Sequence, residues 1–199
     1  MLLAMQRALA HTGLRFALFS DAPLLSGHGE SARRRVARIL EARSVEVYIG
    51  RSVIASGAGE LELASGERFR AQASVWATGA CAPNWIAGCG VGTDPQGFVE
   101  VGETLQSRSH AEIFAAGDIA TIADAARPKS GAIAVRQGPV LARNLRLALG
   151  GLSPEPFRSP ERTLSLISCG ARYAVASWGR LALEGAWIWR WRTESIGDL

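Results

Sequence analysis

The chain has 199 residues, 48% of them hydrophobic and 20% charged, and a formal net charge of +4. This composition is that of an ordinary globular protein and excludes a disordered or low-complexity chain. Because the basic residues are scattered and all but one are arginines, the charge predicts no nucleic-acid partner and only a weak attraction to anions. No stretch reaches the roughly 20 apolar residues that span a bilayer, and no basic segment begins a signal peptide, so we expect a cytoplasmic protein.

The cysteines indicate neither a disulfide framework nor a metal centre. Cys81, Cys89 and Cys169 form no C-x-x-C pair and show no metal-like spacing with the three histidines. We therefore expect reduced, mostly buried thiols and no metal site.

The first third of the chain predicts helices and strands in alternation. Residues 2–9 have the apolar spacing of the end of a helix, residues 14–19 (LRFALF) that of a buried strand, and residues 30–43 that of an amphipathic helix. Short period-two segments then predict a strand, a small antiparallel excursion and a final buried strand. These segments are residues 45–49, 52–55, 61–63, 68–70 and 73–77.

An arginine cluster lies on the outer face of the predicted 30–43 helix. Its members are Arg33, Arg34, Arg35 and Arg38. Such a cluster could hold the 2′-phosphate of a cofactor or a nucleic acid. A solvated helix face is the commoner explanation, and we favour it.

The segment IFAAGD (residues 113–118) predicts a buried parallel strand that ends at a ligand-facing edge. Gly117 has no Cβ and so lets a backbone or cofactor approach closely, and Asp118 can accept hydrogen bonds from a ribose or ribityl hydroxyl. Alone, the segment fits an ordinary turn equally well. It follows a short predicted strand at 98–101 and a region rich in Gly, Pro and Cys (residues 80–97), which is typical of an inter-domain crossing.

Residues 131–149 predict a helix, and Pro139 inside it predicts a kink or a break into two helices. Lys129, the only lysine of the chain, stands just before this helix. The ammonium and the helix N-terminus together create a local positive potential, where a partly anionic ligand could sit.

After a Gly- and Pro-rich linker, short strands spaced like an antiparallel meander are predicted at 163–168, 173–177, 181–183 and 186–191. Trp187, Trp189 and Trp191 alternate in the last of them. The alternation favours a core-facing edge strand, and an interfacial aromatic anchor for a membrane or partner is the alternative.

Four motifs, in this order and spacing, resemble the two-dinucleotide-binding-domain flavoproteins of the pyridine nucleotide-disulfide oxidoreductase family: VWATG, IFAAGD, RPKSGAIAVRQG and SLISCGARYAVASWG. More narrowly they resemble the type II NADH dehydrogenase branch, and most of all the oxidoreductase domain associated with selenide, water dikinase. The resemblance implies an α/β fold with incomplete Rossmann-type FAD- and NAD(P)-binding domains and a small C-terminal α+β domain. The implied domains are an NAD(P)H-binding part (1–79), an FAD-binding part (80–150) and the small domain (151–199).

The resemblance also implies which residues approach the cofactors, FAD and NAD(P)H. The ATG segment passes near the cofactor, the Gly-Asp motif hydrogen-bonds the ribityl chain and pyrophosphate side of FAD, and the helix N-terminus faces the flavin pyrimidine ring. Hydride would pass from NAD(P)H to the flavin, and electrons on to a quinone or another small acceptor, with the protein supplying orientation rather than an acid or base. The implied cofactor-binding residues are Thr78, Gly79, Gly117, Asp118, Lys129, Gly131, Arg136 and Gln137.

Two features depart from the family pattern. Neither of the two G-x-G-x-x-G loops that the family uses for FAD and NAD(P)H is present. The G-x-G-x-G run of Gly88, Gly90 and Gly92 is not a phosphate loop, because Thr-Asp-Pro follows it rather than a helix. Ser20 stands where an acidic residue would grip the adenosine ribose, and Asp21 comes one place later, so NADH and NADPH both stay open. We therefore expect an N-terminally truncated oxidoreductase that binds FAD weakly or not at all by itself. The alternative is a catalytically inactive remnant, or a partner-binding or peripheral membrane-binding module without its own cofactor.

Overall fold

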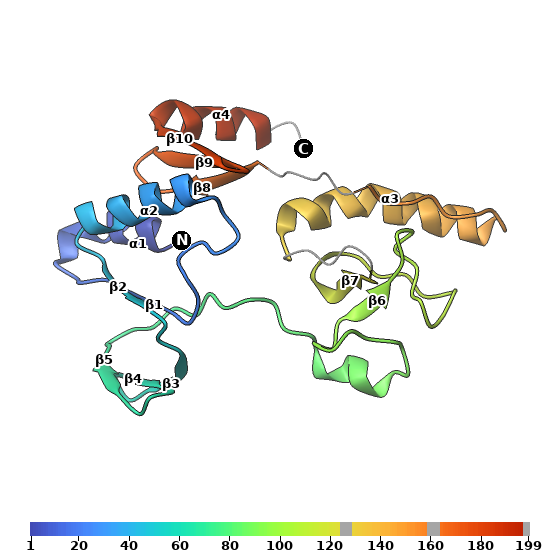
Figure 1. The fold of residues 1–199 in the computed structure, drawn as a ribbon, viewed down its shortest axis with the longest axis horizontal. Coiled ribbons are helices and arrows are strands. Elements are labelled where there is room, and N and C mark those ends of the chain that lie inside the picture. The colour runs from blue at the N-terminus through green and yellow to red at the C-terminus, as the bar shows by residue number, and fades with distance from the viewer. Residues whose placement is uncertain (124–128, 159–163, 197–199) are drawn as a thin grey trace. The chain divides into compact units, whose positions relative to one another are not determined.

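The computed structural model of the chain describes residues 1–123, 129–158 and 164–196. It divides the chain into two compact units, Met1–Val75 together with Glu161–Leu199, and Trp76–Pro160. Each unit has its own buried apolar core. The elements labelled in Figure 1 mix helices with parallel and antiparallel strands, which confirms the predicted α/β class.

The first unit begins with a β-α-β arrangement. β1 (Ala17–Ser20) and β2 (Glu46–Ile49) pair in parallel, and α2 (Glu30–Ala42) lies between them in the chain. Parallel neighbours need such a crossover because a tight turn cannot join them. Before β1 come α1 (Leu2–Ala8) and the 3₁₀ turn η1 (Ala10–Thr12), so the helix predicted at the start of the chain is confirmed.

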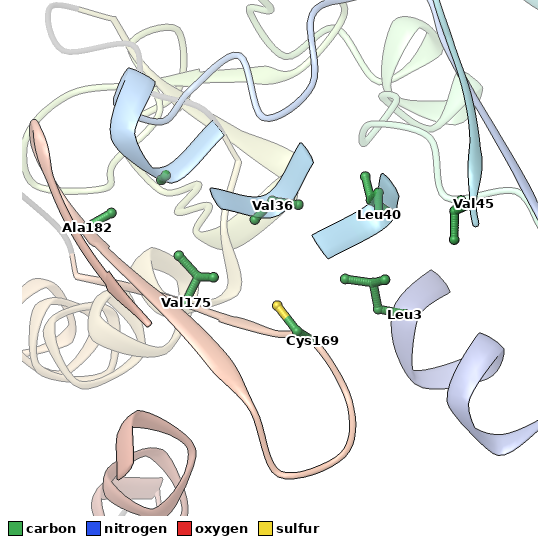
Figure 2. Close-up of a cluster of buried hydrophobic side chains, with 8 residues drawn as sticks. Leu3, Val36, Leu40, Val45, Cys169, Val175 and Ala182 are labelled. Atoms are coloured by element: carbon green, nitrogen blue, oxygen red, sulfur yellow. The ribbon is translucent and has the colours of Figure 1, made fainter. Parts of the chain in front are cut away.

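An antiparallel sheet completes the core of this unit. It consists of β8 (Ser165–Ser168), β9 (Ala174–Trp178) and β10 (Leu181–Gly185), in the order β10-β9-β8. One face of the sheet packs against α2, and Figure 2 shows the side chains that meet there. The buried members are Leu3, Ala32, Val36, Leu40, Val45, Cys169, Val175 and Ala182. Because these are apolar side chains and one thiol, burial of apolar surface holds α2 in this core.

The last helix corrects the strand predicted at 186–191. These residues begin α4 (Ala186–Ile196), which covers the other face of the β8–β10 sheet. Ile188 is buried in that contact, whereas Trp187 and Trp191 are 57% and 46% exposed. The alternation was misleading because the residues between the tryptophans include an isoleucine, and a short continuous apolar run fits a helix as well as a strand.

A meander of three short strands extends the first unit. β3 (Val53–Gly57), β4 (Glu60–Leu63) and β5 (Arg68–Arg70) pair in antiparallel order, as predicted. Three rings connect this meander to the parallel pair: Phe19 stacks on Tyr48 with centroids 4.6 Å apart, and Phe69 lies 5.1 Å and 5.2 Å from them. Aromatic packing therefore joins β1 and β2 to β5.

Residues 73–77 form no strand, which corrects the prediction of a buried strand there. Val75 and Trp76 are 57% and 48% exposed. Among the described residues the parallel sheet of this unit consists of β1 and β2 alone. Parallel strands gain stability when both faces of the sheet are covered, and this narrow sheet does not provide that environment.

The second unit is built around the parallel pair of β6 (Val99–Val101) and β7 (Ala120–Ile122), with the 3₁₀ turns η2 (Asn84–Gly88) and η3 (Gly117–Ile119). Its core consists of Ile86, Val99, Val101, Leu105, Ala115, Ala120 and Phe157. Cys81 and Cys89 are exposed, contrary to the expectation of mostly buried thiols. They lie outside this core, to which residues 80–97 contribute the fully buried Ile86.

The regular strand in this region follows the Gly-Asp motif instead of ending at it. Before the motif, Phe114 makes an isolated bridge to Gln106, and β7 begins only at Ala120. Gly117 has a φ of +73°, a conformation that interrupts an extended chain and that glycine adopts without strain. The predicted strand at 113–118 is therefore displaced towards the C-terminus.

A single long helix, α3 (Gly131–Leu149), completes the unit (Figure 1). It continues through Pro139, so of the two predicted outcomes, a kink or a break into two helices, the break is wrong. Proline removes the hydrogen bond to the carbonyl of Val135, and both residues are exposed, so water can solvate that carbonyl.

Candidate functional site

The N-terminal half of α3 and the Gly-Asp motif meet through one short hydrogen bond. The backbone N–H of Gly117 donates to Oε1 of Gln137 at 2.7 Å, and Gln137 is only 4% exposed. A Cβ at Gly117 would lie 3.5 Å from the Cβ of Ala134, so space is available and the positive φ is what requires glycine. Two residues that the sequence placed at the cofactor are thus brought together.

Next to this contact, a carboxylate and a helix N-terminus are open to solvent. Asp118, the second residue of the motif, is exposed at the start of η3. Gly131 is the exposed first residue of α3, and a Cβ there would meet no atom within 4 Å. Ser130 caps the helix, because its side chain accepts the N–H of Ile133 at 3.3 Å. The positive end of a 19-residue helix is therefore accessible.

Lys129 points its ammonium at β7. Its Nζ donates to the carbonyl of Ala120 and to Oγ1 of Thr121, the latter at 2.9 Å. The same Nζ lies 4.0 Å from the centroid of the Phe98 ring, a cation–π distance. These three contacts hold the positive charge at a fixed place just before α3.

Asp94 is the acidic partner of this network. Its Oδ1 accepts the N–H groups of Gln96 and Phe98 at 2.9 and 3.0 Å, and its side chain is hydrogen-bonded to Thr121. The hydroxyl of Thr121 thus accepts from Lys129 and donates to the carboxylate. Asp94, Thr121 and Lys129 form a chain that connects the turn before β6 with the residues before α3.

The titration of these groups follows from their surroundings. Burial by itself raises the pKa of Asp94, but the hydrogen bonds and the Lys129 charge outweigh it, and the net pKa lies below its ordinary value. Burial lowers the pKa of Lys129, and the charges of Asp94 and Asp118 partly oppose this. The carboxylate is therefore held ionised by contacts of the folded chain.

The remaining predicted site residues are more dispersed. Arg136 lies on α3 next to Gln137, but its side chain is exposed. Thr78 and Gly79 lie in an exposed segment without regular structure, and a Cβ on Gly79 would meet no atom within 4 Å. The structure therefore brings Gly117 to Gln137 and Asp118 near Lys129, whereas Arg136, Thr78 and Gly79 are exposed.

Asn144 is a second polar contact of α3, which the sequence analysis did not find. It is fully buried, and its amide donates to the carbonyls of Thr104 and Glu155 and accepts the N–H of Glu155, each at 2.8 Å. It follows Gln137 by seven residues, so both project from the same face of the helix. A polar heptad pair inside an otherwise amphipathic helix was the signal that could have revealed it.

The described part of the chain holds no group of three acidic, histidine or cysteine side chains that could bind a metal ion. None of its helices combines the length and apolar character needed to cross a bilayer.

The curated proteins that are similar to the chain include two described as an oxidoreductase and an NADH dehydrogenase-like protein. An oxidoreductase of Pestalotiopsis fici is 24% identical over 180 residues, which cover 87% of this chain and 47% of that protein. An NADH dehydrogenase-like protein of Mycobacterium tuberculosis is 36% identical over 95 residues, which cover 48% of this chain and 24% of that protein. The chain thus spans less than half of the length of these relatives.

Solved oxidoreductases share the fold. The sulfide:quinone oxidoreductase from Aquifex aeolicus has a TM-score of 0.73 and 16% identity, over 96% of this chain and 51% of that one. A water-forming NADH oxidase from Lactobacillus brevis, solved bound to NADH, has a TM-score of 0.65 and 18% identity, over 86% of this chain and 39% of that one.

A family model covers the larger part of the sequence. Residues 7–138 match the pyridine nucleotide-disulphide oxidoreductases. The match includes the Gly-Asp motif, Lys129 and Gln137, which form the polar contacts described above. The chain belongs to the pyridine nucleotide-disulphide oxidoreductase family.

Proposed function

We propose that this chain forms the flavin-facing part of an FAD-dependent NAD(P)H oxidoreductase. The observation that carries the proposal is the hydrogen bond from Gly117 to Gln137, which fixes the Gly-Asp motif against α3. This contact holds the exposed Asp118 near the N-terminus of α3 and near Lys129. The positive potential of both suits a partly anionic ligand. The family membership supports the same activity.

The residues present fit one side of FAD. Asp118 would accept hydrogen bonds from ribityl hydroxyls, and the open space at Gly131 would admit a flat ring at the N-terminus of α3. The helix dipole and the fixed Lys129 charge favour negative charge there. When bound, FAD would supply the hydride-accepting ring, while the protein orients it.

The sequence has no G-x-G-x-x-G loop that could bind the pyrophosphate of FAD. We propose that the 199 residues are a C-terminal portion of a longer oxidoreductase, since they span less than half of the curated relatives. In this proposal residues 1–79 belong to the NAD(P)H-binding domain, 80–150 to the FAD-binding domain and 151–199 to the small C-terminal domain.

The acceptor in this proposal is a quinone or another small molecule. The sulfide:quinone oxidoreductase neighbour, which uses a quinone by its name, supports the quinone. Association with selenide, water dikinase rests on the sequence resemblance. Peripheral binding to a membrane or partner is a second candidate, favoured by the exposed Trp178, Trp187 and Trp191 of the first unit. Vesicle co-sedimentation tests it.

Titration of the purified chain with FAD, followed by flavin fluorescence, tests the proposal. We expect weak but saturable binding that weakens about tenfold in Asp118→Ala, since a hydrogen bond to a charged group contributes about 1.5–3 kcal/mol. Glu41→Ala, which removes an exposed carboxylate of the other unit, is the matched control. An equal loss of FAD affinity in both variants would contradict the proposed site. A stoichiometric flavin absorbance peak in the purified protein would contradict the prediction that FAD binds weakly without a pyrophosphate-binding loop.

A further inference from the structure

Lys129 lies near two carboxylates, of which the flavin proposal uses only one. Asp94 lies in the turn before β6, and Asp118 lies in η3, just before β7. Burial lowers the pKa of Lys129 and the charges of both carboxylates oppose this, so both lie within electrostatic reach of the ammonium. Asp118 is exposed and forms no ion pair among the described residues. The contacts of Lys129 therefore decide whether this carboxylate stays accessible.

The contacts of Lys129 favour the side of Asp94. Its Nζ donates to the carbonyl of Ala120 and, at 2.9 Å, to Oγ1 of Thr121. The side chain of Thr121 is in turn hydrogen-bonded to Asp94. The same Nζ lies 4.0 Å from the centroid of the buried Phe98 ring. Two of the three N–H donors of the ammonium are thereby used on β7, and its charge rests on an aromatic face.

Asp94 also fixes the ring that the ammonium contacts. Its Oδ1 accepts the N–H of Phe98 at 3.0 Å, and its own N–H donates to the carbonyl of Phe98 at 2.9 Å. One residue therefore holds both partners of the cation–π contact, the ring directly and the ammonium through Thr121. A turn-forming aspartate explains the contacts with Phe98, but it does not explain the connection to Lys129.

We propose that Asp94 and Thr121 are positioning residues, which hold Lys129 on β7 and thereby leave the carboxylate of Asp118 open to the hydroxyl groups of a ligand. Without them, the flexible lysine side chain turns to Asp118 and pairs with it, and a ligand must break that ion pair to bind. The identity of the ligand rests on the proposed flavin site. The position of Lys129 does not depend on any ligand and is measured separately.

Lys129 is the only lysine, so isotope-labelled lysine gives a single lysine side-chain signal in NMR spectra of the full chain. The ring current of Phe98 should shift its Hε protons upfield. Asp94→Asn keeps an oxygen for the N–H groups of the turn but removes the charge. In this variant the upfield shift should be lost, and a nuclear Overhauser contact to the Hβ protons of Asp118 should appear. Glu41→Gln, at an exposed carboxylate of the other unit, should change neither signal. A retained upfield shift in Asp94→Asn overturns the positioning role.

The variant Thr121→Val removes the hydroxyl that connects Asp94 to the ammonium and keeps the approximate shape of the side chain. It should release Lys129 in the same way, so it decides the question if Asp94→Asn does not fold. Thr12→Val, at an exposed threonine whose hydroxyl donates to the carbonyl of Leu9, is the matched control. An unchanged Lys129 signal in Thr121→Val contradicts the connecting role of the hydroxyl.

Titration with FAD measures the effect on the ligand. Asp94→Asn should weaken FAD binding by about two- to fivefold, the fold-change that corresponds to one exposed ion pair. In a Lys129→Met background the same substitution should have no effect, because no ammonium remains to pair with Asp118. Equal losses in both backgrounds would show a merely structural role of Asp94 and contradict the proposal. If no variant binds FAD while the Lys129 signal moves as expected, the flavin proposal fails and the positioning of Lys129 stands.

Discussion

The helices α2 and α3 are held by different kinds of contact. The buried residues through which α2 meets its sheet are apolar, namely Ala32, Val36 and Leu40, and its ion pairs to Glu184 of β10 come from the more exposed Arg35 and Arg38. α3 also packs apolar side chains, but it adds Gln137 and Asn144, which are both buried and both hydrogen-bonded to backbone of neighbouring loops.

This difference concerns how precisely each helix is placed. Apolar packing depends on volume and tolerates small shifts and conservative replacement. A hydrogen bond weakens steeply when its angle or length changes, so it fixes the register of a loop on a helix. The directional contacts of α3 hold the Gly-Asp motif and the chain around Thr104 and Glu155, which suits a helix that positions a ligand site.

The largest effect is expected from Asn144→Leu, which keeps the approximate volume but removes three buried hydrogen bonds. Leaving the partner groups unpaired should lower the free energy of unfolding by about 3 kcal/mol or more. Leu40→Met is the matched replacement in the apolar core of α2 and should cost less than about 1.5 kcal/mol. Urea unfolding of both variants measures the contrast, and equal losses would refute it.

A smaller effect is expected from Gln137→Leu. The N–H of Gly117 loses its acceptor, and the free energy of unfolding should fall by about 1–2 kcal/mol. Arg146→Ala on the exposed side of the same helix should change it by less than about 0.5 kcal/mol. FAD titration should show weaker binding in Gln137→Leu. Wild-type affinity for FAD in this variant would show that the hydrogen bond does not contribute to the flavin site.

The smallest effect is a pH dependence. The folded-state pKa of Asp94 lies below the ordinary value of 3.8, so its contribution to stability is complete above that pH and is lost as the pH falls through the folded-state pKa. Urea unfolding between pH 6 and pH 3 should therefore show a steeper loss in the wild type than in Asp94→Asn. Parallel curves for the two proteins would show that Asp94 gains nothing from its partners.

Much of the secondary structure was predictable because it follows local periodicity. The α2 stripe, the β3–β5 meander and the α3 helix agree with their sequence patterns. The strand predictions for residues 73–77 and 186–191 were wrong for a common reason. Each segment is a short apolar run, whose secondary structure depends on what it packs against. Among the described residues, no sheet pairs with residues 73–77, whereas residues 186–191 pack as part of α4 against the β8–β10 sheet.

The candidate site divides in the same way. The sequence identified Gly117, Asp118, Lys129 and Gln137 because their motifs resemble a family. It did not identify Asp94 and Thr121, which contact each other and Lys129 only after β6 and β7 pair in parallel. Contacts between residues far apart in sequence leave no local signal.

By itself, the sequence determined the α/β class, the position of the long helix after Lys129 and the family of the chain, because periodicity and motif spacing are properties of neighbouring residues. The tertiary structure alone decided which partners pack against each helix. It joined Gly117 to Gln137, placed Asn144 between two loops, and set Glu184 of β10 among the arginines of α2. The physical reason is that hydrogen bonds and ion pairs form between atoms close in space, and only folding brings these atoms together.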